Sequence, residues 1–385
     1  MNRRSAMKAI GLATVNLSMP MMAGAEKPAR GELNLYVGTY TSGQSKGIHL
    51  FRLKMATGEL IPVGLVGETV NPSYLSIDRR GRYLYAVNEV NNFNGQPGGG
   101  LTAFAIDRET GSLRELNRQG TKGGSPCYVA LHPEGRFALV ANYGGGSVAV
   151  LPINRDGSLG AAVDVAQHTG SGANPQRQPG PRAHFIMATP DRRRVMAVDL
   201  GIDKVMIYRW DGKRGKLLPN DPPFFAARAG AGPRHLDFHP GGRLAYLINE
   251  LDSTLTACSY DSRSGGLTEV QTVSTLPAGF QGNNTCADLH VHQSGKFVYG
   301  SNRGHDSIAA FRIDQSSGRL ELIAHEPTQG RNPRNFVIDP TGAFLLAANQ
   351  SSDSIVVFRI DPGTGKLTPA GKMASVSMPV CLKFV

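Results

Sequence analysis

Seven Gly-x-Leu tripeptides are spaced along this chain at intervals that average about 51 residues. The copies begin at Gly58, Gly111, Gly157, Gly215, Gly265, Gly318 and Gly365. A repeat of this length indicates a chain built from similar structural units. Glycine is typical of tight turns because it adopts the positive φ that other residues avoid. Each copy is therefore expected to mark a turn at the same place in its unit.

A second repeat, independent of the first, shows what one unit contains. Six segments of the same pattern begin at residues 72, 126, 183, 233, 286 and 333. In each, a Gly (once Arg192) lies nine residues after the start, and an Asn or Asp lies sixteen after it. The pattern predicts a strand, a tight turn and a second strand, followed by a third strand such as SIAAFRID, the Gly-x-Leu turn and a fourth. Four short strands in about 50 residues are typical of a β-propeller blade.

The sequence therefore predicts an all-β, seven-bladed β-propeller with four antiparallel strands per blade, as a single domain over residues 32–385. The seventh blade would take its inner strand from the C-terminal MPVCLKFV. LNLYVGTY, GIHLFRLK and the segment after Gly58 would supply the other three. Closing the ring with both termini removes exposed sheet edges. With 47 Gly, 24 Pro and no long amphipathic helical stretch, an all-helical or doubly wound α/β fold is disfavoured.

Residues 1–25 predict an export signal peptide, because a basic start precedes a moderately apolar stretch and the small-residue pattern Ala23-Gly24-Ala25. Arg3-Arg4 resembles a twin-arginine signal, although Ala6-Met7 replaces the usual Phe-Leu pair. We expect a periplasmic protein, with a cytoplasmic one as the alternative. No other segment reaches the roughly 18 apolar residues that a membrane span needs, so none is expected.

The formal net charge is +11, from 41 Lys and Arg against 30 Asp and Glu. The basic residues are dispersed, and their densest run is Arg192 to Arg194. Nucleic-acid binding usually requires a concentrated basic stripe with aromatic residues, so no nucleic-acid partner is expected. A small anionic substrate is the better explanation of the excess positive charge. We expect a monomer.

No cysteine or histidine pattern predicts a metal site. The four cysteines lack metal-type spacing and are expected to be buried free thiols: Cys127, Cys258, Cys286 and Cys381. His290 and His292 would share one face of a strand, as metal ligands could. Because His132 and His239 occupy the same blade position as His292, a structural role is favoured. There is also no nucleophile elbow, phosphate-binding glycine loop or zinc helix motif, so no cofactor is expected.

Polar side chains are predicted to gather at one rim of the propeller. The start of the first strand and the end of the second are antiparallel neighbours, and this rim opens onto the channel if the first strand is innermost. The residues at these positions differ in every blade, as expected where unlike groups converge on one asymmetric ligand. The candidates are Glu89, His184, Arg234, His235, Glu250, Asp288, Arg303, Arg334 and Asn335.

These residue types can perform acid–base and oxyanion chemistry. Arginine binds carboxylate or phosphate in a bidentate manner and can stabilise a developing oxyanion. A His or Glu with a pKa tuned by such neighbours can transfer a proton or activate water. The structural alternative is a set of salt bridges lining a wet channel.

Several strings resemble the seven-bladed lactonase family, which includes propeller-type 6-phosphogluconolactonases and fungal carboxy-muconate lactonising enzymes. They include GSPCYVALHPEGRFALVANYGGGSV, GAGPRHLDFHPGGRLAYLINEL and GKFVYGSNRGHDSIAAFRID, and the resemblance covers essentially the whole chain after the signal. It implies a metal-independent enzyme that opens or closes lactone rings. It also implies catalytic roles for His184 in GPRAHF, Arg234 in GPRHL, Glu250 in INEL and Arg303 in SNRG.

The leading hypothesis is hydrolysis of a sugar-type lactone, most like 6-phosphogluconolactone or a related aldonolactone. Arg234, Arg303 and Arg334 would hold the anionic or hydroxyl-rich substrate, assisted by His235, Asp288, Asn335 and Glu89. Glu250 or His184 would activate water, and the residues alone leave that choice open. An export signal is unexpected for an enzyme whose substrate, 6-phosphogluconolactone, is made in the cytoplasm.

Three other functions remain open. One is a carboxy-muconate-type cycloisomerase that uses the same residues. Another is a non-catalytic periplasmic propeller that binds a sugar acid, a peptide or an envelope partner, since propellers host many functions. The third is a metal-dependent gluconolactonase, which the arginine-rich rim disfavours because cations repel a divalent ion.

Overall fold

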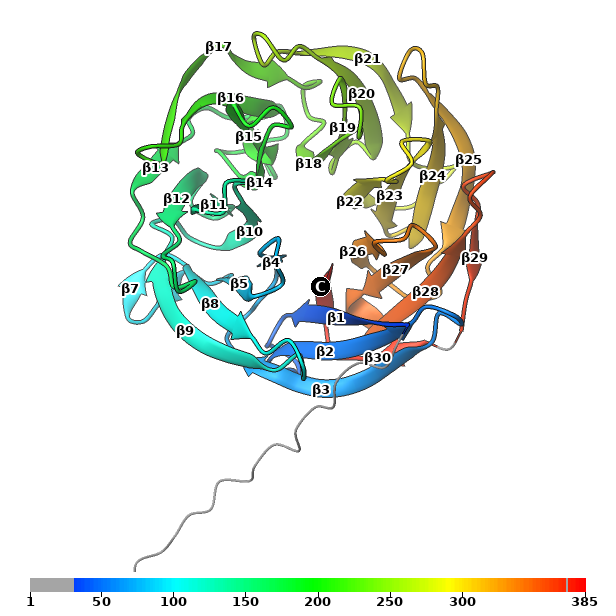
Figure 1. The fold of residues 1–385 in the computed structure, drawn as a ribbon. Coiled ribbons are helices and arrows are strands. Elements are labelled where there is room, and N and C mark those ends of the chain that lie inside the picture. The colour runs from blue at the N-terminus through cyan, green and yellow to red at the C-terminus, as the bar shows by residue number, and fades with distance from the viewer. Residues whose placement is uncertain (1–30, 372) are drawn as a thin grey trace, which may run out of the picture.

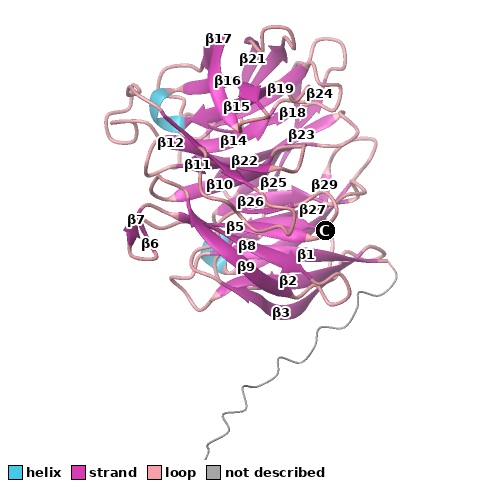
Figure 2. Ribbon diagram, turned by 60° about the vertical axis from the view of Figure 1, so that its left-hand side comes forward, coloured by secondary structure: helices cyan, strands magenta, loops and turns pink. Residues whose placement is uncertain are grey.

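The computed structural model describes residues 31–371 and 373–385. Seven antiparallel sheets, each with four strands along its main path, are arranged as blades around a common axis (Figure 1). Strands make up nearly all of the regular structure in the turned view, which also shows two short helices (Figure 2). These are single 3₁₀ turns, η1 (Leu200–Ile202) and η2 (Gln350–Ser352). In the described residues, no helix has the length and apolar character needed to cross a membrane.

One blade joins the two ends of the chain, as the sequence predicts. From the inside outward it contains β31 (Pro379–Phe384), β1 (Glu32–Thr39), β2 (Gly47–Lys54) and β3 (Leu60–Glu68). The next blade contains β4 (Leu75–Ile77), β5 (Tyr83–Asn88), β8 (Gly100–Ile106) and β9 (Leu113–Gly120). A small hairpin, β6 (Asn92–Phe93) and β7 (Gln96–Pro97), is inserted between its second and third strands.

The other five blades are each made from consecutive strands. The third blade contains β10 (Pro126–Leu131), β11 (Phe137–Asn142), β12 (Ser147–Pro152) and β13 (Asp164–Gln167). The fourth contains β14 (Ala183–Ala188), β15 (Arg194–Asp199), β16 (Lys204–Asp211) and β17 (Lys216–Ala226). The fifth contains β18 (Pro233–Phe238), β19 (Leu244–Asn249), β20 (Thr254–Tyr260) and β21 (Leu267–Ser274). The sixth contains β22 (Thr285–Val291), β23 (Phe297–Arg303), β24 (Ser307–Ile313) and β25 (Leu320–Pro327). The seventh contains β26 (Pro333–Ile338), β27 (Phe344–Asn349), β28 (Ser354–Ile360) and β29 (Leu367–Pro369), and β30 (Ala374–Ser375) pairs with β28.

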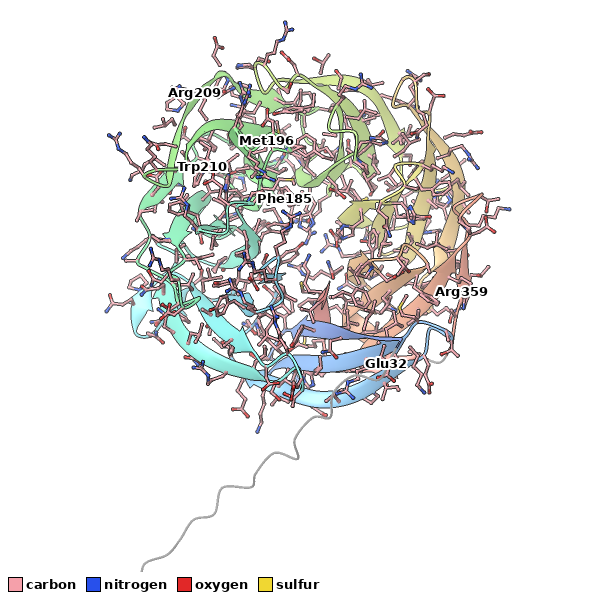
Figure 3. The ribbon with its side chains drawn as sticks, viewed as in Figure 1. Glu32, Phe185, Met196, Arg209, Trp210 and Arg359 are labelled. Atoms are coloured by element: carbon pink, nitrogen blue, oxygen red, sulfur yellow. The ribbon has the colours of Figure 1, made fainter. Side chains whose placement is uncertain are left out.

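The hydrophobic core lies between blades. Second strands such as β11 and β27 are buried along their whole length, because a neighbouring blade covers each face. The outer strand β9 instead contains only partly buried and exposed residues, because no further strand covers it. In Figure 3, Phe185 on β14 lies near the centre of the ring and Arg209 on β16 lies at its outside. The channel is therefore lined by the first strand of each blade.

The Gly-x-Leu repeat marks a contact between neighbouring blades. All seven of its glycines have φ between 67° and 87°, the left-handed region that favours glycine. A Cβ on Gly365 would lie 2.5 Å from the ring of Phe297 in the preceding blade. The carbonyl of Gly365 accepts a 2.9 Å hydrogen bond from the buried hydroxyl of Tyr299. The tripeptide therefore recurs because the turn both needs positive φ and packs tightly against the preceding blade.

The other two repeated positions are also structural. The five glycines at position nine have φ between 62° and 79°, and Arg192 has φ 61°. The Asn at position sixteen caps the end of the preceding blade's outer strand: Asn302 donates to the Thr275 carbonyl at 2.8 Å. His292 lies with Nε2 3.0 Å from the Gly342 carbonyl in the turn of the next blade, consistent with the expected structural role.

Candidate active site

The predicted rim carries a pocket of about 220 Å³ where the channel opens. It is lined by Tyr40, Glu89, Cys127, Tyr143, Arg177, His184, Glu250, Arg303 and Arg334. Most of these residues begin a first strand or end a second strand, so they come from most of the blades around the ring. Antiparallel pairing places both kinds of position at the same rim, as in the pairing of Pro126 with Asn142. The register of the repeat thus builds the pocket.

A β-bulge re-aims the first rim residue of several blades. The pairing of the first two strands shifts register between Ala183 and Phe185, between Pro233 and His235, and between Pro333 and Asn335. The residues inside these bulges are His184, Arg234 and Arg334. An irregularity of this kind turns a side chain out of the regular alternation, and bulges are frequent next to active sites. The bulges therefore bring consecutive polar residues to the channel.

Three guanidinium groups surround the Glu250 carboxylate. Its Oε2 accepts from Arg234 Nε at 3.0 Å and lies 2.9 Å from Arg303 Nη2, and its Oε1 accepts from Arg177 Nη2 at 2.5 Å. Burial alone would raise the pKa of Glu250. The guanidinium groups of Arg303, Arg234 and Arg177 outweigh that effect and hold the pKa at about 2. Glu250 is therefore ionised at neutral pH and fixes the positions of the guanidinium groups.

A buried chain of hydrogen bonds supports Arg234 from below. Arg234 Nη1 donates to the Ala287 carbonyl and lies 3.2 Å from His235 Nε2. His235 Nδ1 lies 2.8 Å from Asp288 Oδ1. Burial and the charge of Arg234 lower the pKa of His235 to about 4, so its ring is neutral at pH 7. Because Asp288 can only accept, Nδ1 carries the proton and Nε2 accepts from Arg234.

His184 is a neutral imidazole beside this cluster. It is buried, and its ring centroid lies 5.5 Å from that of Tyr143 and 5.2 Å from that of His235. Burial, followed by the charges of Arg234 and Arg334, holds the pKa of His184 well below its usual value. Its Nδ1 has no hydrogen-bond partner among the described residues. A buried nitrogen without a partner is costly, which is typical of a group that serves a ligand.

Arg334 lies across the pocket, next to Tyr40 and Glu89. Its guanidinium carbon is 5.5 Å from the centre of the Tyr40 ring, and the Tyr40 hydroxyl donates to Glu89 Oε2 at 2.9 Å. Burial alone would lower the pKa of Arg334, but the neighbouring Tyr40 and Glu89 stabilise its charged form and raise the pKa overall. The guanidinium makes no hydrogen bond or ion pair with any residue of the described chain. It is therefore a cation available to an anionic ligand.

The sequence-predicted site residues fall into two layers. His184, Glu250, Arg303, Arg334 and Glu89 line the 220 Å³ pocket. The others lie beneath it: Arg234, His235 and Asn335 line a void of about 10 Å³, and Asp288 lines a cavity of about 70 Å³. Asn335 donates to Asp288 Oδ2 and accepts from the Leu382 amide at 2.7 Å, which ties β26 to its neighbours.

Four pocket residues are absent from the sequence-based candidates: Cys127 and Tyr143, which lie at rim positions of the third blade, and Tyr40 and Arg177. Tyr40 follows β1, whose Thr39 pairs with Pro379, so it occupies in the split blade the position that Glu89 and Glu250 occupy in theirs. Extending the repeat register across the two termini would have found it. Arg177 lies in the long loop between β13 and β14, outside the repeat, and no pattern in the sequence marks it.

The described residues contain no group of three His, Cys, Asp or Glu side chains arranged to hold a metal ion. All four cysteines are buried free thiols, as expected, and burial raises the pKa of the Cys127 thiol that lines the pocket. The predicted signal at residues 1–25 lies outside the described residues.

Comparison with known proteins identifies the family. Residues 34–384 match the family model described as lactonase, 7-bladed β-propeller. The chain is 42% identical over 350 residues to the 6-phosphogluconolactonase of Bacillus subtilis, covering 91% of this chain and 97% of that protein. It is 35% identical over 312 residues to the 6-phosphogluconolactonase of Formosa agariphila, covering 80% and 86%. The solved structure of the periplasmic gluconolactonase of Pseudomonas aeruginosa matches with a TM-score of 0.87 and 38% identity, covering 92% and 99%. The chain therefore belongs to the seven-bladed β-propeller lactonase family and is a lactonase.

Proposed function

We propose that this lactonase hydrolyses a sugar-type lactone, 6-phosphogluconolactone or a related aldonolactone, by metal-independent attack of water in the 220 Å³ pocket. The observation that carries the proposal is the convergence in one pocket of His184, with an unpartnered ring nitrogen, and Arg334, a cation that forms no salt bridge among the described residues. The names of the Bacillus subtilis and Pseudomonas aeruginosa relatives support this substrate class.

His184 is the proposed general base. Glu250 has a pKa of about 2, because three guanidinium groups stabilise its ionised form, so it is a poor proton acceptor at neutral pH. Burial and the neighbouring cations hold the pKa of His184 low as well, but its Nδ1 has no hydrogen-bond partner among the described residues, whereas both Glu250 oxygens accept from guanidinium groups. Glu250 would instead hold Arg303 and Arg234 in place for the reaction.

In the proposed step, the oxygen of a water molecule attacks the lactone carbonyl carbon while His184 takes one of its protons. The resulting oxyanion is stabilised by the guanidinium of Arg303, backed by Arg234. Collapse of the tetrahedral intermediate breaks the ring C–O bond, and His184 returns the proton to the leaving ring oxygen. The products are a free hydroxyl and a carboxylic acid, which ionises and releases one proton to solution.

Arg334 would bind the phosphate or a hydroxyl group of the substrate. It faces the pocket, forms no salt bridge among the described residues and is held against the Tyr40 ring. Glu89, paired with the Tyr40 hydroxyl, can accept a hydrogen bond from a sugar hydroxyl. Metal independence is supported by the charge around Glu250, since three cations within 3.0 Å of its oxygens disfavour a divalent ion there.

A pH-stat assay tests the proposal. Acid release is measured on 6-phosphogluconolactone, gluconolactone and a muconolactone, each with and without a chelator and corrected for spontaneous hydrolysis. We expect chelator-insensitive release on a sugar lactone, and a loss of roughly 10²–10⁴-fold in the rate for His184→Ala. His239→Ala, a histidine in a turn at the other end of a blade, is the control and should retain activity.

Loss of activity with the chelator would refute metal independence, and wild-type turnover by His184→Ala would refute its role. Activity confined to formation of a lactone from a muconate would favour the cycloisomerase. Absence of activity on every substrate tested would favour a non-catalytic binding protein.

We propose that the protein is exported to the periplasm as a monomer. The basic and apolar pattern of residues 1–25 supports export, and the relative from Pseudomonas aeruginosa is named as periplasmic. Cell fractionation of the wild type and of an Arg3→Lys, Arg4→Lys variant tests it: export is expected only for the wild type, and retention of both in the cytoplasm would refute it. Light scattering of the purified protein tests the monomer.

A further inference from the structure

The opposite end of the channel carries a cavity of about 1130 Å³, five times the volume of the candidate active site. It lies where β4, β10 and β14 end, and the turns that follow these strands form its wall. Seven basic side chains line it, and we call them the basic funnel: Arg79, Arg80, Arg82, Arg136, Arg155, Arg192 and Lys383. Only two acidic residues, Asp78 and Glu134, line the same cavity.

The two acids do not neutralise the funnel. Asp78 lies 3.4 Å from Arg82 Nε, and Glu134 lies 3.1 Å from Arg136 Nη2. Four arginines form no ion pair with any acid of the described chain, and all four are exposed: Arg79, Arg80, Arg155 and Arg192. Unpaired like charges around one concavity repel one another and concentrate anions there.

The repeated blades show that part of this charge is not needed for the fold. A basic residue follows the turn position in most blades, as Arg82 does here and as Arg243 and Lys296 do in the fifth and sixth blades. Arg79, Arg80 and Arg192 have no basic counterpart in the other complete units. A residue that the blade required would recur in every blade. The cations of the funnel are gathered on four adjacent blades, which indicates a local purpose.

Arg192 adopts a backbone conformation that is unfavourable for any residue with a side chain. It occupies the turn position that is glycine in the five other complete units, and it has φ 61°. A side chain in the left-handed region strains the backbone, and such strain is concentrated at functional sites. Here the strain places an arginine at the edge of the funnel.

Aromatic side chains form the inner wall of the funnel. Tyr74, Tyr83 and Tyr128 line it, and the Tyr74 and Tyr128 rings are 4.0 Å apart. Lys383 Nζ lies 4.8 Å from the centre of the Tyr74 ring and 3.3 Å from its hydroxyl. Rings beside cations suit an organic anion rather than a bare inorganic one.

The funnel is separate from the candidate active site. Between them lies a void of about 10 Å³ lined by Tyr74 and His235, which has room for about one water molecule. A ligand in the funnel cannot reach the pocket through this constriction. The two ends of the channel are therefore separate spaces.

From these observations we propose that the basic funnel is a second binding site, for an organic polyanion that carries several phosphate groups. Such groups can belong to a soluble phosphate ester or to the headgroups of an anionic lipid surface. The unpaired arginines would bind phosphate oxygens in a bidentate manner, and the tyrosines would contact the organic frame. The site is independent of lactone hydrolysis.

Calorimetric titration of the full chain with inositol hexakisphosphate and with pyrophosphate tests the soluble source. Co-sedimentation with phosphatidylglycerol vesicles, compared with phosphatidylcholine vesicles, tests the lipid source. We expect binding that weakens as salt rises, with an affinity about tenfold or more lower in an Arg79→Gln, Arg80→Gln variant. The control is Arg243→Gln, Lys296→Gln, which removes the same charge from exposed turns at the same end and should change the affinity less than about twofold.

Arg192→Gly adds a readout that a nonspecific charge effect would not give. We expect weaker binding together with an unchanged or higher melting temperature, because glycine relieves the backbone strain. Equal weakening by the control variant, a lower melting temperature for Arg192→Gly, or no binding of any probe would overturn the proposal. All variants should keep wild-type lactonase activity, so failure here is distinct from failure of the proposed function.

Discussion

Replacing Glu250 by Gln should destabilise the protein in a pH-dependent way. The carboxylate has a pKa of about 2 when folded, against an ordinary value of 4.5. A shift of this size corresponds to about 3 kcal/mol of stability at neutral pH. Since the folded pKa is depressed, this contribution is complete above pH 4.5 and is lost as the pH falls towards 2. At pH 3.5 it should be about 2 kcal/mol.

Urea unfolding followed by the fluorescence of Trp210, the single tryptophan, measures this effect. The free energy of unfolding of Glu250→Gln should lie about 3 kcal/mol below the wild type at pH 7, with a smaller gap at pH 3.5. Glu115→Gln is the matched control: its carboxylate lies 2.6 Å from Arg118, but the pair is exposed and should contribute less than about 1 kcal/mol. A gap for Glu250→Gln as small as that of the control, or one that does not narrow in acid, would refute the reasoning that burial makes this ion cluster strong.

Three further results are expected. Asp288→Asn should lower kcat roughly tenfold or more with little change in KM, because His235 loses the acceptor that fixes its Nδ1–H form; a kcat equal to the wild type would contradict this. A base active when deprotonated loses activity as the pH falls through its pKa, so kcat/KM should be flat from pH 6.5 to 8 and fall only well below pH 6.5, as the depressed pKa of His184 requires. Gly365→Ala should destabilise the protein by roughly 2 kcal/mol or more in thermal unfolding, because Gly365 has φ 75° and an added Cβ would lie 2.5 Å from the Phe297 ring. Gly279→Ala is the control and should destabilise the protein less, because Gly279 has a similar φ of 79° but open space around its Cβ position.

The sequence by itself determined the architecture. The Gly-x-Leu turns follow from the need for positive φ, and the sixteen-residue spacing follows from the antiparallel pairing of two strands. Both are local properties, so they recur from blade to blade. The same register predicted the rim that holds His184, Glu250 and Arg303, because each is a rim position of its own blade. A local pattern that recurs in successive blades can be recognised in the sequence before the fold is known.

Only the tertiary structure decided which rim residues face the ligand. Bulges turn His184 and Arg334 into the pocket, whereas His235 and Asp288, their neighbours on the same rim, lie beneath it and support Arg234. The sequence does not show this division, because a bulge depends on how two strands pair rather than on the residue type.

The sequence also does not predict that the loop before β14 brings Arg177 to within 2.5 Å of Glu250. The pKa values follow from the same convergence, since a charge is shifted by burial and by neighbours that come from other blades. Contacts within a blade are encoded locally, and contacts across the channel exist only once the ring has closed.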